Sequence, residues 1–161
     1  MAGMLSDLIG ILKEQTQRLE ELKGLALEKR DIIVKNDIEE LQKITNLESI
    51  VITQSNRLEK KRISITNDIA LVLGKQGEEL DLKTLEELLP DQPEKIELAE
   101  VGRRIRTVAL ELQEINELNN SLVQNALEFI EYSLNIIRST AEPELMGFDD
   151  DTPMGSIDIK T

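Results

Sequence analysis

Apolar residues recur along most of this chain at alternating intervals of three and four positions. The first such stretch covers residues 4–34, the second covers 37–73, and the third begins near Pro93 and meets no helix breaker until Pro143. An average period of about 3.5 residues is typical of helices that pack along a common seam. The pattern predicts an all-α fold, a long antiparallel three-helix bundle or coiled coil.

Signals for starting and stopping helices stand between these stretches. Residues 34–37 form a tight reversal, in which Asn36 is expected to cap the second helix and Glu39 completes a capping box. Gly74 follows the last apolar position of the second stretch, where a left-handed residue ends many helices. Pro93 suits the first turn of the third helix.

The connection at residues 75–92 and the C-terminal end differ from the long helices. Four leucines, ended by Pro90, predict one or two helical turns that act as a lid on the bundle: Leu82, Leu85, Leu88 and Leu89. Residues 141–161 hold prolines, glycines and three consecutive aspartates without a sustained period, so they are expected to form a flexible acidic tail. The bundle domain is therefore assigned to residues 1–140.

Polar residues occupy a few seam positions: Gln15 and Lys29 in the first helix, Glu48, Ser55 and Arg62 in the second, and Asn119 in the third. A buried amide at Asn119 is expected to fix the register, because it prefers one partner.

The connections also align the helices vertically. The reversal near residue 35 sets the second helix antiparallel to the first, and the lid brings the third helix back along the second. At equal rise per residue, residue 37 is then level with about residue 130, so the third helix outruns its neighbours. This overhang is apolar and predicts a surface for docking another helix. The alternatives are that it folds onto the tail or pairs with a second copy.

Composition narrows the function. The 161 residues include 32 acidic and 19 basic ones, a net charge of −13 that disfavours nucleic acid and anionic lipid and favours neutral or basic partners. Cysteine and histidine are absent, which removes thiolate chemistry, Cys-based zinc sites and the usual general base. We expect no enzyme, cofactor or metal site. The N-terminus lacks a basic start, and the longest apolar run, residues 69–73, is too short to span a bilayer, so a cytoplasmic protein without membrane insertion is expected.

Two charged features admit a functional and a plainer interpretation. Basic residues at 57–62 and 103–106 are level with each other and form either a contact for an acidic partner or nucleic acid, or a solvated, internally paired helix face. The Glu20–Glu21, Glu39–Glu40 and Glu86–Glu87 pairs are either paired carboxylates for chemistry or ordinary helix surface. The plainer interpretation is preferred for both, because nothing in the sequence shields them from water.

Three stretches of the sequence resemble a known family. Residues 27–41 (LEKRDIIVKNDIEEL), 114–122 (EINELNNSL) and 126–137 (ALEFIEYSLNII) are similar to FlgN-type flagellar export chaperones. Phe148-Asp149 matches the start of an aromatic-Asp-x-x-Gly pattern in the family's tail, although no glycine follows before Gly155.

The resemblance implies a function and a site. Members of that family are cytoplasmic chaperones that bind unassembled hook-associated proteins through their C-terminal helix. They prevent early polymerisation and deliver the client to the flagellar type III export gate. Carried over by position, the client-binding residues would be Leu122, Ala126, Phe129, Ile130, Tyr132, Ser133, Leu134, Ile136 and Ile137, with Phe148 as a tail contact. The alternative from another class is a structural coiled-coil scaffold or dimerisation module without a client.

Overall fold

The computed structural model of the chain describes residues 2–75 and 80–140. These residues form α1 (Ala2–Lys35), α2 (Ile38–Val72), α3 (Leu82–Leu88) and α4 (Pro93–Thr140). The all-α prediction is confirmed. Helices α1 and α2 begin and end within two residues of their predicted bounds, and α4 begins at Pro93 as predicted. The expected acidic tail, residues 141–161, lies outside the described residues.

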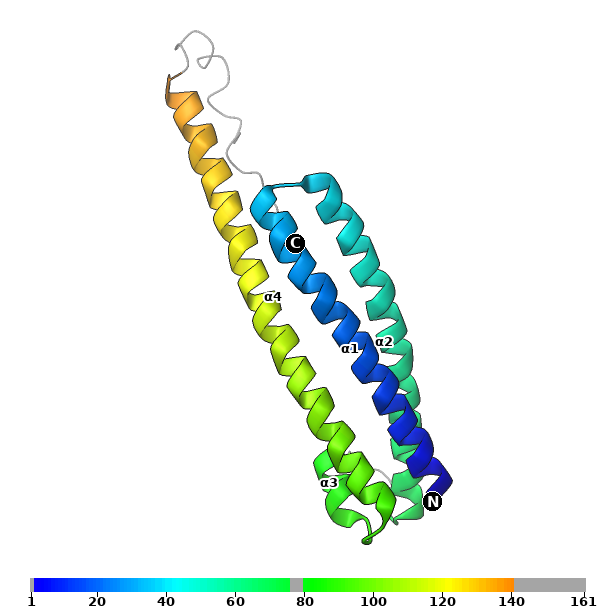
Figure 1. Cartoon of the computed structure of the whole chain (residues 1–161). Coiled ribbons are helices and arrows are strands. Elements are labelled where there is room, and N and C mark those ends of the chain that lie inside the picture. Colours follow the sequence, from blue (N-terminus) through cyan, green and yellow to red (C-terminus); the bar gives the residue numbers. More distant parts are fainter. Residues whose placement is uncertain (1, 76–79, 141–161) are drawn as a thin grey trace.

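Helix α1 lies between the other two long helices (Figure 1). It packs against both α2 and α4, whereas α2 and α4 have no comparable contact with each other. Three ion pairs join α1 to α4 and advance together along both helices, which shows that these helices are parallel: Lys13–Glu97, Arg104–Glu20 and Lys23–Glu111. Helix α2 is antiparallel to both.

The prediction that the third long helix lies along the second was wrong, since α4 lies along α1. Burial explains the choice. Helix α1 buries nine of its residues, compared with six in α2 and five in α4. The helix with apolar side chains on two sides takes the central position, because only there are both sides removed from water.

The α1–α2 turn and the end of α2 use the same hydrogen-bond pattern. Asn36 adopts the left-handed conformation with φ 55°. Its N–H donates to the carbonyl oxygen of Ile33 at 3.1 Å, and the N–H of Asp37 donates to the carbonyl oxygen of Ile32 at 3.3 Å. Asn36 therefore ends α1 and does not cap α2, contrary to the prediction. The cap is Asp37, whose side chain accepts the N–H of Glu40 at 3.2 Å. Asparagine tolerates left-handed geometry better than most residues, which suits it to the turn.

The hydrophobic core is concentrated at the α3 end of the bundle. Helix α3 closes that end with Leu85 fully buried, and the adjoining Leu80 and Leu89 are buried too, so the predicted lid is confirmed. Most side chains with zero exposure lie here, among them Leu5, Leu8, Ile69 and Leu98. Toward the other end of the molecule fewer side chains are fully buried, so we expect the α3 end to contribute more to stability.

Gly24 provides a test of how much helix propensity contributes. It lies inside α1, is exposed, and a Cβ built there would have no neighbour within 4 Å. Gly24→Ala should therefore stabilise the protein by about 1 kcal/mol, because alanine favours the helix without a clash. Urea unfolding followed by circular dichroism measures this.

Gly74 is the matched control for Gly24. Its φ of +73° lies in the left-handed region, and its N–H bonds the carbonyl of Leu71 at 3.2 Å to close α2. Gly74→Ala should lower the stability by about 1–2 kcal/mol, because an L-residue is strained there. A stabilising effect of both substitutions would show that the assigned backbone geometry at Gly74 is wrong.

Candidate functional site

Helix α4 extends beyond the end of α1 and the α1–α2 turn (Figure 1). The last buried residue of α4 is Asn119, whose Nδ2 donates to the carbonyl oxygen of Ala26 at 2.8 Å. The expectation of a buried amide with one partner is thereby confirmed. Helix α4 continues for about six turns after Asn119. This C-terminal part carries side chains that no other described element buries.

Five large side chains on this part of α4 are exposed, and we call them the α4 strip: Phe129 (69%), Ile130 (47%), Tyr132 (63%), Ile136 (43%) and Ile137 (64%). The other four residues predicted for the site, Leu122, Ala126, Ser133 and Leu134, are half-buried. Phe148 lies outside the described residues. Apolar exposure of this extent on a chain of net charge −13 is characteristic of an interaction surface.

The structure places a recess beside the α4 strip, and the α1 side of this recess was not among the predicted site residues. The last turn of α1 and the following residue face α4 across a recess of about 270 Å³, which we call the turn recess. It is lined by Ile33, Val34 and Asn36 from the turn and by Leu122, Asn125, Ala126, Phe129 and Ile130 from α4. Val34 is 65% exposed. The predicted level of residue 37 beside residue 130 already places the α1–α2 turn next to this part of α4 and could have indicated these residues.

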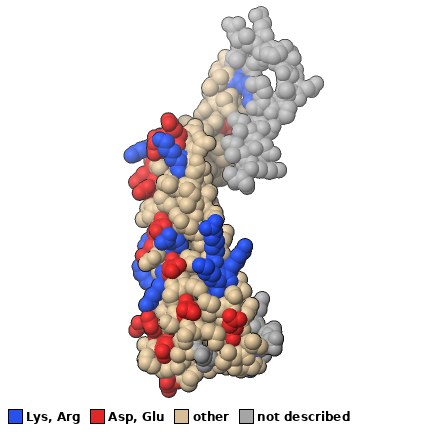
Figure 2. All heavy atoms as spheres, turned by 90° about the vertical axis from the view of Figure 1, so that its right-hand side faces the viewer, with Lys and Arg blue, Asp and Glu red and all other residues tan. Residues whose placement is uncertain are grey.

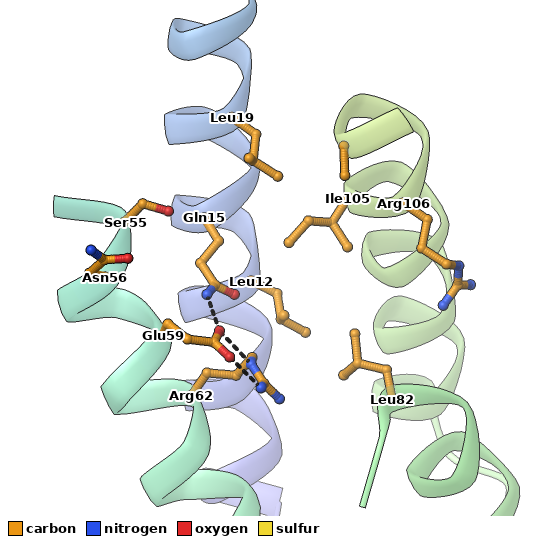
Figure 3. A pocket seen from close by; sticks show the side chains of 11 residues that line it. Leu12, Gln15, Leu19, Ser55, Asn56, Glu59, Arg62, Leu82, Ile105 and Arg106 are labelled. Carbon is orange, nitrogen blue, oxygen red and sulfur yellow. Dashed lines mark hydrogen bonds and ion pairs between the residues drawn. The ribbon is translucent and has the colours of Figure 1, made fainter. Parts of the chain in front are cut away.

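A second hollow lies over α1 between α2 and α4, and we call it the Gln15 groove (Figure 3). Figure 3 shows Gln15, Glu59 and Arg62 joined at its α2 side. Its apolar side chains are Leu12, Leu19, Leu82, Ile105 and Ala109. Gln15 Nε2 donates to Glu59 Oε2 at 2.8 Å. Arg62 makes two bonds to the same carboxylate, at 2.8 and 2.6 Å.

This network accounts for polar residues at the helix seams. Gln15 is only 7% exposed, and its Nε2 is satisfied by a carboxylate that Arg62 neutralises. Nearer the α1–α2 turn, Lys29 Nζ lies 3.0 Å from Glu48 Oε1, so these two polar seam positions also face each other. Complementary polar pairs at facing positions favour one register over its alternatives. The polar contacts on the α2 side of the groove therefore have a role in bundle assembly.

The Glu59 carboxyl gives a prediction for pH. Hydrogen bonds from Arg62 lower the pKa of Glu59, partial burial opposes this, and the bond from Gln15 lowers it further. A carboxyl whose pKa is depressed by folding adds stability above its unfolded pKa of about 4.3 and loses it as the pH falls through the folded value.

We therefore expect Glu59→Gln to be less stable than the wild type at pH 7, with the difference shrinking below about pH 4.3. Urea midpoints of both proteins between pH 7 and 3 measure this. A difference that stays constant over that range would contradict the assignment.

The basic residues of the sequence are in part internally paired. Arg62 pairs with Glu59 and Arg104 with Glu20, and among the described residues Arg57, Lys60 and Lys61 have no carboxylate within 4 Å. Figure 2 shows Lys and Arg gathered at mid-height on the face it displays, with Asp and Glu above and below them. The mixed signs fit a solvated helix face better than a nucleic-acid surface.

Within the described residues, three carboxyls have a shifted pKa and each is lowered: Glu59 by Arg62, Asp81 by Thr84 and Glu111 by Lys23, through hydrogen bonds. A lowered pKa keeps a carboxyl ionised at neutral pH, which is the wrong direction for a general acid. Over residues 2–75 and 80–140, no three acidic side chains gather as metal ligands, and no helix is both long and apolar enough for a membrane span.

One comparison with known proteins gives a match. The FlgN protein family matches residues 1–148, which include all four helices. No curated protein and no solved structure matches the chain.

Proposed function

The chain belongs to the FlgN family of flagellar export chaperones, and from this premise we propose that it binds unassembled hook-associated proteins through the α4 strip. In this proposal the chaperone works in the cytoplasm and keeps its client from polymerising early. It then delivers the client to the flagellar type III export apparatus.

The observation that carries the proposal is the exposed end of α4. Phe129, Tyr132 and Ile137 are each more than 60% exposed, whereas Leu5, Leu85 and Leu98 at the α3 end have zero exposure. Aromatic residues suit a docking surface, because they contribute large contact area with few rotatable bonds. An amphipathic helix laid along this strip would remove the apolar surface of both partners from water.

Release is as important as binding in this mechanism. The client's terminal helices are apolar on one face and exposed before assembly, so a chaperone must cover them reversibly. A dissociation constant of about 1 μM, roughly −8 kcal/mol, covers the client while allowing hand-over at the export gate. A strip on one helix, without a deep enclosing pocket, fits such moderate affinity.

A scaffold or dimerisation module is the rival function. It would bury the same strip permanently against a second copy, as helices with apolar seams often do. The two functions differ in whether the strip of the purified protein is free to accept a client.

Light scattering coupled to size-exclusion chromatography separates them. The purified protein is run alone and with a purified hook-associated protein of the same flagellar system. We expect a new complex containing both chains. A dimer that forms alone, persists on dilution and excludes the hook-associated protein would establish the scaffold function instead.

A further inference from the structure

The α4 strip borders the turn recess, and the two share Phe129 and Ile130. Helix α1 ends at Lys35, and left-handed Asn36 then directs the chain away into α2. On the α4 side, the small Ala126 is half-buried, whereas the larger Phe129 and Ile130 are exposed. A helix lying on the strip would therefore meet the α1–α2 turn at one edge.

The lining of the recess indicates what it accepts. Six of the residues around it are apolar, and two are the amides Asn36 and Asn125, with no charged side chain from the described part of the chain. Its volume of about 270 Å³ lies just below the roughly 300–1,000 Å³ of small-molecule sites. One apolar side chain fits such a space, and the amides can bond the backbone at its rim.

The surroundings of the recess are acidic. Residues 117–140 carry three acidic side chains and one basic one, and residues 31–43 carry four and two. Lys43 pairs with Glu40 at 3.1 Å and with Glu39, and the acidic residues of this segment still outnumber the basic ones. A helix approaching this end is favoured if basic residues flank its apolar face.

We propose that the α1–α2 turn forms the second wall of the client site: the client helix lies on the α4 strip, inserts one apolar side chain between Val34 and Phe129, and carries basic residues beside that face. This inference rests on the proposed function, because the occupant is a helix of the unassembled client. Val34 then determines which side chain the client can insert.

The test replaces Val34 without weakening the fold. Val34 is 65% exposed in the last turn of α1, where a lysine is favourable to the helix dipole. Val34→Lys should raise the dissociation constant for a purified hook-associated protein about tenfold or more, measured by isothermal titration calorimetry. Val34→Thr, which keeps the shape and replaces one methyl group with a hydroxyl, should raise it severalfold. Leu110→Lys is the matched control, since Leu110 is 61% exposed on α4 but away from the recess.

Phe129→Asp is titrated in the same series so that the two ideas can be told apart. If Phe129→Asp loses binding while both Val34 variants bind like the wild type, the second wall is wrong and the proposed function stands. If neither position matters, the proposed client site fails and the inference fails with it. Raising the salt from about 50 to 300 mM should weaken wild-type binding, because exposed charges are screened. Unchanged or tighter binding at high salt would contradict the proposal that basic residues flank the apolar face of the client helix.

Discussion

Phe129→Asp should abolish client binding while leaving the helical content intact. Phe129 is 69% exposed, so an aspartate there meets water in the free protein and costs the fold little. In the complex the same aspartate would be buried against apolar surface without a partner. The lost phenylalanine contact and the buried charge together should raise the dissociation constant about a hundredfold or more.

Far-UV circular dichroism and calorimetric titration with a hook-associated protein check this together. Ile136→Asp, farther along the strip and 43% exposed, should behave in the same way. Leu110→Asp on the same helix, at 61% exposure, should bind like the wild type. A collapse of helicity in Phe129→Asp would mean that the side chain is part of the core and that the strip is misassigned.

Leu98→Ala should have the opposite effect, with a large loss of stability at a site remote from the strip. Leu98 has zero exposure and packs in the core at the α3 end, with Leu8 and Leu85 in the same cluster. Truncation removes buried apolar surface and leaves a cavity, which should lower the free energy of unfolding by about 2–5 kcal/mol. The urea midpoint measures this.

Leu110→Ala is the control for Leu98→Ala, because it makes the same chemical change at an exposed position. It should alter the stability by less than about 0.5 kcal/mol. Similar losses at the two positions would contradict the division between a stabilising end and the proposed docking end.

The two ends of the bundle differ in how much apolar surface they bury. The α3 end holds fully buried residues from α1, α2 and α4, together with Leu85 of the lid, whereas α4 buries nothing after Asn119. Stability from one end allows the other end to keep apolar residues exposed without loss of the fold. An uncovered strip is costly in solubility, and the net charge of −13 offsets that.

The helices themselves could be predicted from the sequence because local chemistry determines them. The seam spacing gave three long elements, Gly74 marked the end of α2, and Pro93 marked the start of α4. The lid was also predictable, because its leucines had to be buried against some other apolar surface. The overhang of α4 followed from helix lengths alone.

The arrangement of the helices could not be predicted in the same way. An amphipathic pattern shows that a face is buried, but it does not identify the neighbour, so the pairing of α4 with α1 was missed. Asn36 and Asp37 are both good caps, and only the left-handed φ of Asn36 decides between them. Val34 belongs to the turn recess through a contact between segments about ninety residues apart, which local patterns do not encode.

Hydrogen exchange of the chaperone with and without a purified hook-associated protein, read by mass spectrometry, tests the client surface most directly. The account predicts slower exchange in peptides covering residues 127–140, with little change in α3 and the first half of α4. Binding that leaves residues 127–140 unprotected would contradict it.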